Sequence, residues 1–300
     1  MNRLQMHSIR TITVALAALL AACSSVPPAG ERDSAARQRA AAAGLAPRQF
    51  AAGSLPLQAF VRGGCPGQPL HVYIEGDGYA WVSSTLPSGD PTPLNPVALR
   101  LAAGDRACNV AYLGRPGQYR AGQVAPRYWL EARFAPEVID AYVATIEELA
   151  QESAAPAVHL AGYSGGGAIA ALAAARLAPT HPGLTLRTVA GNLDTQTWAR
   201  RRRLTPLAAS LNPAAAAAAL ADVPQLHLLG TRDRQVPPYV QEAYLAALPS
   251  PRCAQLRRIE AGHAGPWEDA WRQALEEVPA CRERRPAFRE ANPPPRAEKR

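Results

Sequence analysis

Metal-ligand spacing is missing from this sequence. Its six histidines and 24 acidic residues form no H-x-x-x-H pair and no cluster with ligand spacing, so we expect neither a metal site nor a cofactor. Aromatic residues are also scarce, at 6% of the 300-residue chain, and no basic patch is interleaved with stacking aromatics. The net charge of +8 therefore does not indicate a nucleic-acid-binding protein. Internal repeats are absent as well.

The N-terminal apolar run is too short to span a bilayer comfortably. It follows Arg3 and Arg10 and ends in small residues before Cys23, a pattern that predicts an export signal over residues 1–22. The string Leu20-Ala21-Ala22-Cys23 resembles the bacterial lipobox, in which the cysteine is acylated and becomes the first mature residue. A plain secretory signal with an incidental cysteine is the alternative.

Ser24, directly after the cysteine, resembles lipoproteins sorted to the outer membrane. We expect a membrane protein of the cell envelope, held by acyl chains such as palmitate and facing the periplasm. Residues 23–48 contain hardly any large apolar side chain, which predicts a flexible tether with room for a short helix over 34–43. The basic, proline-rich tail 284–300 is expected to be disordered. Residues 49–283 suffice for one domain, which we expect to be a monomer.

Short apolar segments alternate with helical patterns along this domain. The expected strands are 57–61, 70–74, 109–113, 158–161, 184–190, 225–229 and 255–259, and the expected helices are 96–103, 134–150, 214–221, 238–248 and 267–277. This alternation predicts an α/β protein with a mostly parallel central sheet and helices on both faces. The segment from Asp194 to Ala219 is long enough only for a small cap.

Four cysteines besides Cys23 allow three disulfide connectivities. Cys65 and Cys108 each precede a predicted strand, so a parallel sheet would place them side by side. Cys253 precedes the last strand and Cys281 follows the last helix. We therefore expect the pairs Cys65 with Cys108 and Cys253 with Cys281, which suits an oxidising periplasm.

The stretch Val158 to Ala168 is the most informative of the chain. A short apolar run stops at Gly162, Ser164 stands among glycines, and an alanine-rich helical pattern begins at Gly165. A serine on so sharp a strand-to-helix turn has strained backbone angles, and Gly162 and Gly166 must be small for strand and helix to pass close by. The turn exposes the hydroxyl and aims the helix N-terminus at whatever the oxygen attacks.

Two later residues are expected at the same edge of the sheet. Asp233 follows the strand Q-L-H-L-L-G, and His263 follows the final strand. Functional groups in open parallel sheets collect at the carboxyl ends of the strands, so Ser164, Asp233 and His263 are expected to converge. Asp194 follows the preceding strand and is the alternative acid.

The order serine, acid, histidine, each after its own strand, resembles the α/β-hydrolase fold of serine esterases and lipases. The elbow G-Y-S-G-G, the loop G-x-x-D-x-x-V-P and the pair G-H carry this resemblance. More narrowly, the chain is similar to exported bacterial hydrolase lipoproteins. The resemblance implies that Ser164 attacks a carbonyl, His263 takes its proton and Asp233 orients the imidazole.

The resemblance also implies an oxyanion hole. Its donors would be the N–H of Gly165 and an N–H of the turn after the strand 70–74, from Asp77 or Gly78. Many family members have His-Gly in this turn, whereas this chain has Glu75-Gly76-Asp77-Gly78. Two carboxylates beside an oxyanion repel it unless they point away or are paired. Glu75 is expected to tie down the turn through Arg115 or Arg127.

These features predict a membrane-tethered serine hydrolase of the carboxylesterase class. It would cleave a small-molecule or lipid ester through an acyl-enzyme on Ser164. The same triad could serve a peptidase, a thioesterase or an acyltransferase, and the fold could also be a non-catalytic envelope binding module. The run Arg200 to Arg203 in the cap could bind an acidic headgroup, or it could be a solvated helix face.

Overall fold

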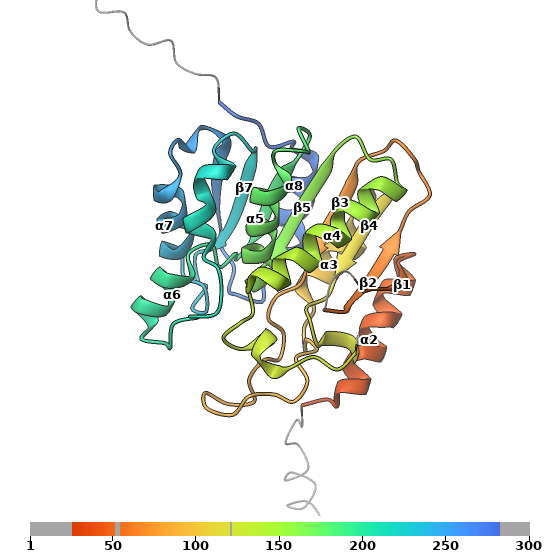
Figure 1. The fold of residues 1–300 in the computed structure, drawn as a ribbon, viewed down its shortest axis with the longest axis vertical. Coiled ribbons are helices and arrows are strands. Elements are labelled where there is room, and N and C mark those ends of the chain that lie inside the picture. The colour runs from red at the N-terminus through yellow and green to blue at the C-terminus, as the bar shows by residue number, and fades with distance from the viewer. Residues whose placement is uncertain (1–25, 52–54, 121, 283–300) are drawn as a thin grey trace, which may run out of the picture.

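The central sheet of the protein has eight strands, seven of which were expected from the sequence. The computed structural model describes residues 26–51, 55–120 and 122–282. The strands are β1 (Ala46–Phe50), β2 (Leu57–Arg62), β3 (Leu70–Ile74), β4 (Asn109–Leu113), β5 (Val158–Tyr163), β6 (Thr185–Val189), β7 (Gln225–Gly230) and β8 (Ala254–Ile259). They lie in the order β1-β2-β4-β3-β5-β6-β7-β8 (Figure 1).

All neighbouring strands from β4 to β8 are parallel, whereas β1 pairs antiparallel with β2 and β2 with β4. The predicted mostly parallel sheet is therefore confirmed. Strands β3, β5 and β6 lie in the middle of the sheet, and their apolar side chains are buried on both faces. Such double burial explains why β3 and β5 are mostly apolar in sequence, whereas β6 also buries Thr185, Arg187 and Thr188.

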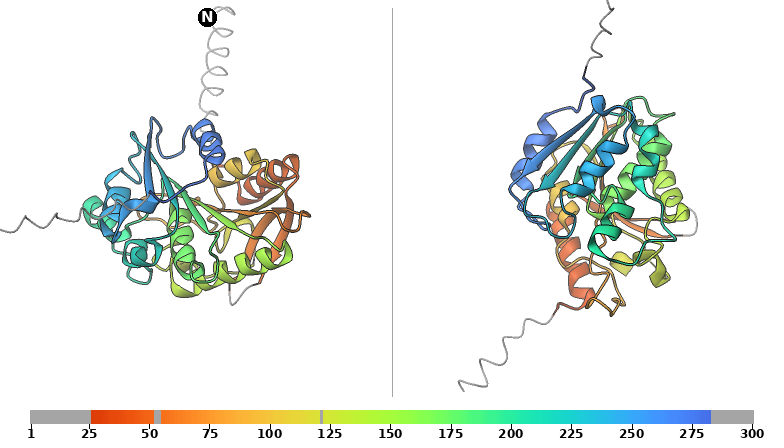
Figure 2. Two further views of the ribbon diagram at one scale, coloured as in Figure 1. Left: turned by 90° about the horizontal axis from the view of Figure 1, so that it is seen from above. Right: turned by 90° about the vertical axis from the view of Figure 1, so that its left-hand side faces the viewer.

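Helices cover both faces of the sheet, as predicted (Figure 2). One core cluster joins the sheet to α4, α5 and α7, and a second joins it to α2, α3 and α8. The helices are α2 (Ala29–Ala42), α3 (Val97–Gly104), α4 (Pro136–Glu152), α5 (Gly165–Leu177), α6 (Thr195–Arg202), α7 (Tyr239–Ala247) and α8 (Glu268–Glu276). Short 3-10 helices span Gln118–Arg120, Pro126–Trp129, Pro213–Leu220 and Pro251–Cys253. Among the described residues, none of the helices meets the length and hydropathy needed to cross a membrane.

The prediction of a flexible tether over residues 23–48 is wrong for residues 26–48, the part that the structure describes. Helix α2 buries Ala36 and Ala40 against the second core cluster, and β1 forms the edge of the sheet. Small alanine side chains let α2 pack closely while giving almost no hydrophobic signal in the sequence. The domain therefore begins well before residue 49. The signal 1–22, Cys23 and the tail 284–300 lie outside the described residues.

Both expected disulfides are present. Cys65 bonds to Cys108, and Cys253 bonds to Cys281. The first links the segments that lead into β3 and β4, which are neighbours in the sheet, and this is the relation from which the pairing was expected. The second ties the entry of β8 to the chain that follows α8.

Candidate active site

Ser164 lies on a sharp turn between β5 and α5. Its backbone has φ 52° and ψ −119°, a conformation that is strained for a residue with a side chain. A Cβ on Gly162 would lie 2.3 Å from the carbonyl oxygen of Gly166, and a Cβ on Gly166 would lie 2.2 Å from that of Ile74. The close approach of β3, β5 and α5 thus leaves room for no side chain at either glycine.

His263 and Asp233 are brought to this turn by the loops after β8 and β7. The Nε2 atom of His263 lies 3.0 Å from Ser164 Oγ, and its Nδ1 atom lies 2.8 Å from Asp233 Oδ2. Ser164 is 9% exposed, the His263 side chain is 11% exposed, and the Asp233 side chain is fully buried. The arrangement can pass a proton from the serine hydroxyl to an imidazole that a carboxylate orients.

The carboxylate of Asp233 is itself fixed by the backbone. Its Oδ1 atom accepts hydrogen bonds from the N–H groups of Gln235 at 2.8 Å and Val236 at 2.9 Å, which leaves Oδ2 for His263. Asp194, the alternative acid, lies elsewhere: it is the N-cap of α6 and accepts from the N–H of Thr197.

Two aromatic residues that the sequence analysis missed hold the loop of His263. The indole N–H of Trp267 donates to the carbonyl of His263 at 2.9 Å, and the hydroxyl of Tyr163 donates to the same oxygen at 3.1 Å. Trp267 is fully buried, so its position is set by the core. The sequence analysis gave neither Tyr163 nor Trp267 a role, since no local pattern links them to the carbonyl of His263.

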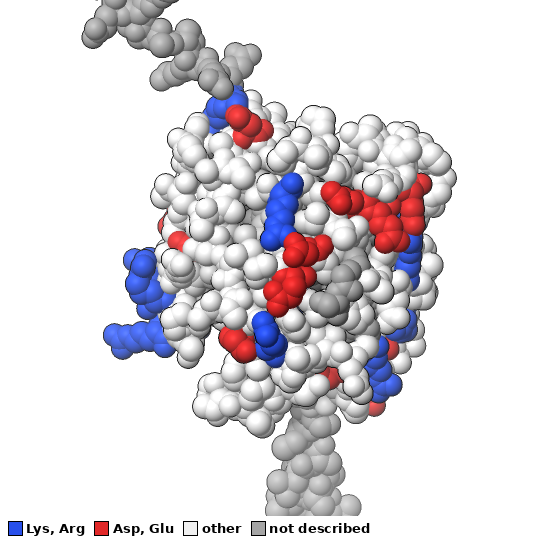
Figure 3. Space-filling model, in the orientation of Figure 1, with Lys and Arg blue, Asp and Glu red and all other residues white. Residues whose placement is uncertain are grey.

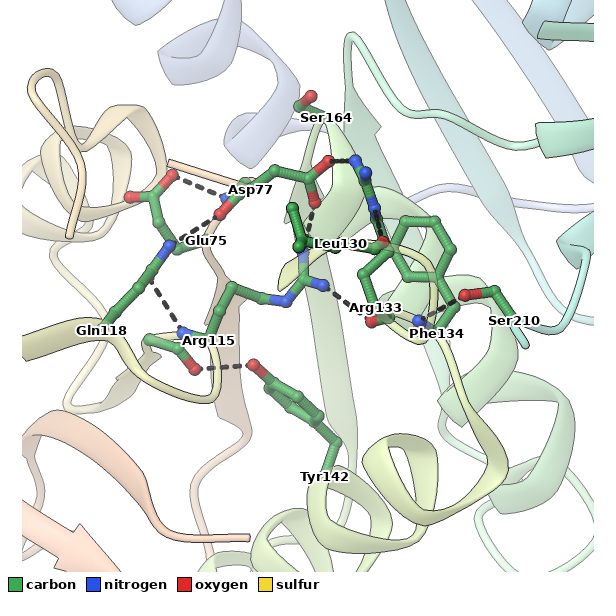
Figure 4. Close-up of polar contacts among 12 residues, drawn as sticks. Glu75, Asp77, Arg115, Gln118, Leu130, Arg133, Phe134, Tyr142, Ser164 and Ser210 are labelled. Atoms are coloured by element: carbon green, nitrogen blue, oxygen red, sulfur yellow. Dashed lines mark hydrogen bonds and ion pairs between the residues drawn. The ribbon is translucent and has the colours of Figure 1, made fainter. Parts of the chain in front are cut away.

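Asp77 is held by two arginines, as Figure 4 shows. Its Oδ1 atom lies 2.7 Å from Arg115 Nη1, and its Oδ2 atom lies 2.6 Å from Arg133 Nη1. Arg115 also donates to the carbonyl of Arg133 at 2.7 Å, so the three residues form one network. Burial opposes ionisation of Asp77, but Arg133 and Arg115 outweigh it and hold the pKa of the carboxyl below its ordinary value.

The expected partner of Arg115 was wrong. The network also shows that Asp77, one of the two carboxylates expected beside the oxyanion, is paired. Arg115 pairs with Asp77 instead of Glu75, and Arg127 pairs with Glu137 at 3.2 Å. Arg133 was not considered in the sequence analysis, since 56 residues separate it from Asp77 and no spacing rule links them.

Glu75 lies on the other side of the turn, fully inside the protein. Its carboxyl accepts hydrogen bonds from the N–H of Gly76 at 2.8 Å and, at 3.4 Å, from the N–H groups of Ala98 and Leu99 at the start of α3. The Tyr112 hydroxyl lies 3.2 Å away. Burial, the largest influence, raises the pKa of this carboxyl from 4.5 to about 7, against the lowering effect of these hydrogen bonds.

Glu75 should make the free energy of unfolding fall as the pH rises. Its folded pKa is above its unfolded one, so its contribution is complete below pH 4.5 and is lost as the pH approaches 7. Between pH 5 and pH 8 this loss is about 2 to 3 kcal/mol. We expect Glu75→Gln to remove it, measured by urea unfolding at both pH values. Glu137→Gln, on the surface, is the control, and equal pH dependence of wild type and Glu75→Gln would contradict the prediction.

The turn 75–78 lies directly against the nucleophile. A Cβ on Gly76 would lie 3.3 Å from the Ser164 Cβ, and a Cβ on Gly165 would lie 2.0 Å from Asp77 Oδ1. The N–H of Gly76 is engaged by Glu75, whereas those of Asp77 and Gly165 donate to no group among the described residues. Gly165 is also the first residue of α5, where N–H groups lack intrahelical partners.

The fold was compared with known proteins. No family model matches the chain, and no curated protein matches it. Among solved structures, a membrane phospholipase A described as a bacterial virulence factor has a TM-score of 0.52 and 16% identity, over 93% of this chain and 100% of that one. An alpha-beta serine hydrolase homologue from Coxiella burnetii has a TM-score of 0.52 and 15% identity, over 77% and 93%. Est1E from Butyrivibrio proteoclasticus with ferulic acid has a TM-score of 0.55 and 13% identity, over 76% and 98%.

The chain has the α/β-hydrolase fold. This confirms the fold that the sequence analysis expected from the order of Ser164, Asp233 and His263. Ser164, Asp233 and His263 follow β5, β7 and β8, and all three lie at the carboxyl edge of the sheet. At these identities the likeness shows the fold alone.

Proposed function

We propose that this α/β hydrolase cleaves carboxylic esters through an acyl-enzyme on Ser164. The observation that carries the proposal is the unbroken chain of two hydrogen bonds, 3.0 Å from Ser164 to His263 and 2.8 Å from His263 to Asp233. A serine held in a strained turn within reach of an oriented imidazole is a nucleophile with its general base in place.

The reaction would take place in two displacements. His263 takes the hydroxyl proton as Ser164 attacks the ester carbonyl, and the imidazolium then protonates the leaving alcohol. Water, deprotonated by His263, attacks the acyl-enzyme and releases the acid. Asp233 keeps the Nδ1 proton on the imidazole throughout, which leaves Nε2 free to accept the serine proton.

The oxyanion of each tetrahedral intermediate would be held by backbone N–H groups. Gly165 supplies one from the start of α5, and Asp77 supplies the second, with Gly78 as the alternative. The side chain of Asp77 does not repel the oxyanion as a free carboxylate would, because Arg115 and Arg133 neutralise it. One such donor contributes on the order of 3 kcal/mol to transition-state stabilisation.

We also propose that Cys23 is acylated and tethers the enzyme to the outer membrane, with the domain in the periplasm. The lipobox-like string before Cys23 and the two disulfides, which suit an oxidising compartment, support this location. The solved structures with a similar fold include a membrane phospholipase A, and Est1E with ferulic acid bound.

A fluorophosphonate probe tests the nucleophile directly. The chain 24–300 keeps every residue of the described fold, so it can be used as a soluble form. We expect the probe to label the wild type and to label neither Ser164→Ala nor His263→Ala. Labelling that survives in Ser164→Ala would assign the nucleophile elsewhere, and a folded wild type without labelling would favour a binding module. Rates with p-nitrophenyl esters, thioesters and peptides then separate the esterase from the other triad enzymes.

A further inference from the structure

The loop that follows the turn 75–78 exposes several large apolar side chains together, which a soluble enzyme has no reason to do. Residues 79–88 fold back on themselves: the N–H of Val82 donates to the carbonyl of Leu86 at 2.8 Å, and that of Ser88 donates to the carbonyl of Ala80 at 3.0 Å. We call this segment the apolar hairpin. Its three large apolar side chains are exposed, Trp81 by 41%, Val82 by 50% and Leu86 by 56%. The hairpin contains no charged residue.

The apolar hairpin directly continues the turn 75–78. It begins one residue after Gly78, and the N–H of Tyr79 donates to the carbonyl of Pro91 at 3.0 Å, which brings the two ends of the loop together. The indole N–H of Trp129 donates to the carbonyl of Ser88 at 3.1 Å and braces the base of the hairpin. The next exposed apolar side chain, Leu94 at 49%, follows in the irregular segment between the hairpin and α3.

The N-terminal end of the described chain lies beside the loop that carries the apolar hairpin. The guanidinium of Arg32 in α2 lies over the ring of Tyr79 at 5.2 Å and donates to the carbonyl of Thr92, so α2 is fixed to the loop that carries the hairpin. Val26, which is 46% exposed, precedes this helix. Only Ser24 and Ser25 separate it from Cys23, the residue that we propose is acylated.

Positive charge lies at the same edge of the sheet. Helix α6 ends in Arg200, Arg201 and Arg202, which are exposed together with Arg203. The indole N–H of Trp198 donates to the carbonyl of Gln235 at 2.8 Å, so α6 lies against the loop that carries Asp233. In Figure 3 basic side chains project where α6 lies, and the lobe at the lower left, where the hairpin lies, is largely uncharged.

We propose that Val26, the apolar hairpin and Leu94 contact a lipid bilayer, with the arginines of α6 over its anionic headgroups. Exposed apolar groups at the same edge of the sheet as cationic ones fit the boundary between acyl chains and headgroups. This inference rests on the proposed function and names its substrate class: the ester would be an acyl ester of a membrane lipid, presented at the surface on which the enzyme lies. Acyl transfer to Ser164 and hydrolysis by water proceed as for any ester.

Vesicle co-sedimentation of the chain 24–300, which lacks Cys23, tests the surface without the anchor. We expect the wild type to bind phosphatidylethanolamine–phosphatidylglycerol vesicles, and the triple variant Trp81→Ser, Val82→Ser, Leu86→Ser to bind on the order of tenfold more weakly. Val278→Ser is the matched control, because Val278 is 73% exposed and lies after α8. Equal binding by the triple variant and this control would overturn the proposal, as would no binding by the wild type.

Two further measurements separate the possible failures. The rate on vesicle lipid divided by the rate on soluble p-nitrophenyl butyrate is expected to fall on the order of tenfold in the triple variant, relative to Val278→Ser. Vesicle binding without hydrolysis of either ester would remove the proposed function and leave the surface in place. Hydrolysis of the soluble ester without vesicle binding would remove the surface alone. A wild-type dimer that the triple variant converts to a monomer, seen by light scattering, would assign the hairpin to a second copy of the chain instead.

Discussion

Replacing Asp233 with asparagine is expected to lower kcat on p-nitrophenyl esters by about 10⁴-fold, the loss that the equivalent change causes in the serine-protease triad. The structure explains why so small a change would be so costly. The Oδ1 atom of Asp233 accepts hydrogen bonds from two backbone N–H groups, and its Oδ2 atom accepts one from the imidazole of His263. The N–H groups of Gln235 and Val236 will hold the amide oxygen of the new side chain in the Oδ1 position.

The amide NH₂ group of the Asp233→Asn variant would then face Nδ1 of His263 and donate to it. The imidazole would carry its proton on Nε2, where it can no longer accept the proton of Ser164. The charge that stabilises the imidazolium would be lost as well. We expect the fold to survive, because the amide keeps the backbone hydrogen bonds, and thermal unfolding followed by circular dichroism checks this.

Asp194→Asn is the matched control for this prediction. Asp194 caps α6, and asparagine is as good an N-cap as aspartate, so both kcat and stability should stay close to those of the wild type. If Asp194→Asn lost more activity than Asp233→Asn, the acid would be assigned wrongly.

Features whose signal is local in the sequence were the predictable ones. The turn around Ser164 was predictable because glycines at fixed positions report the close approach of β3, β5 and α5, which the backbone contacts of Gly162 and Gly166 confirm. The positions of Asp233 and His263 followed from one topological rule, since each comes directly after a parallel strand. Neither inference needed a contact between distant side chains.

The parts that the sequence analysis missed depend on such contacts. Helix α2 was assigned to a tether because its alanines give little hydrophobic signal, although Ala36 and Ala40 are buried. The pairing of Asp77 with Arg115 and Arg133 joins segments 38 and 56 residues apart. Thirty-one of the 32 basic residues of this chain are arginines, so composition alone cannot indicate which arginine reaches a given carboxylate.

Asp77→Ala is expected to affect stability and catalysis together. Without this carboxylate, the guanidinium groups of Arg115 and Arg133 remain inside the protein, 2% and 8% exposed, with no acidic partner. Leaving a buried charge unpaired costs on the order of 3–5 kcal/mol of the free energy of unfolding. Urea unfolding measures this loss, and Asp140→Ala is the control, because its pair with Arg176 lies on the surface and should contribute no more than about 1 kcal/mol.

The kinetics of Asp77→Ala test whether the Asp77 side chain positions the turn 75–78 for catalysis. The network holds the backbone of this turn against Ser164, so its loss should misplace the second oxyanion donor. A donor of this kind acts on the transition state more than on the bound ester, so kcat should fall about 10²-fold while KM changes little. The kinetics should be measured well below the melting temperature of the variant, so that unfolding does not imitate the effect. A destabilised enzyme with wild-type kcat would show that the network serves the fold alone, and that the turn keeps its position without it.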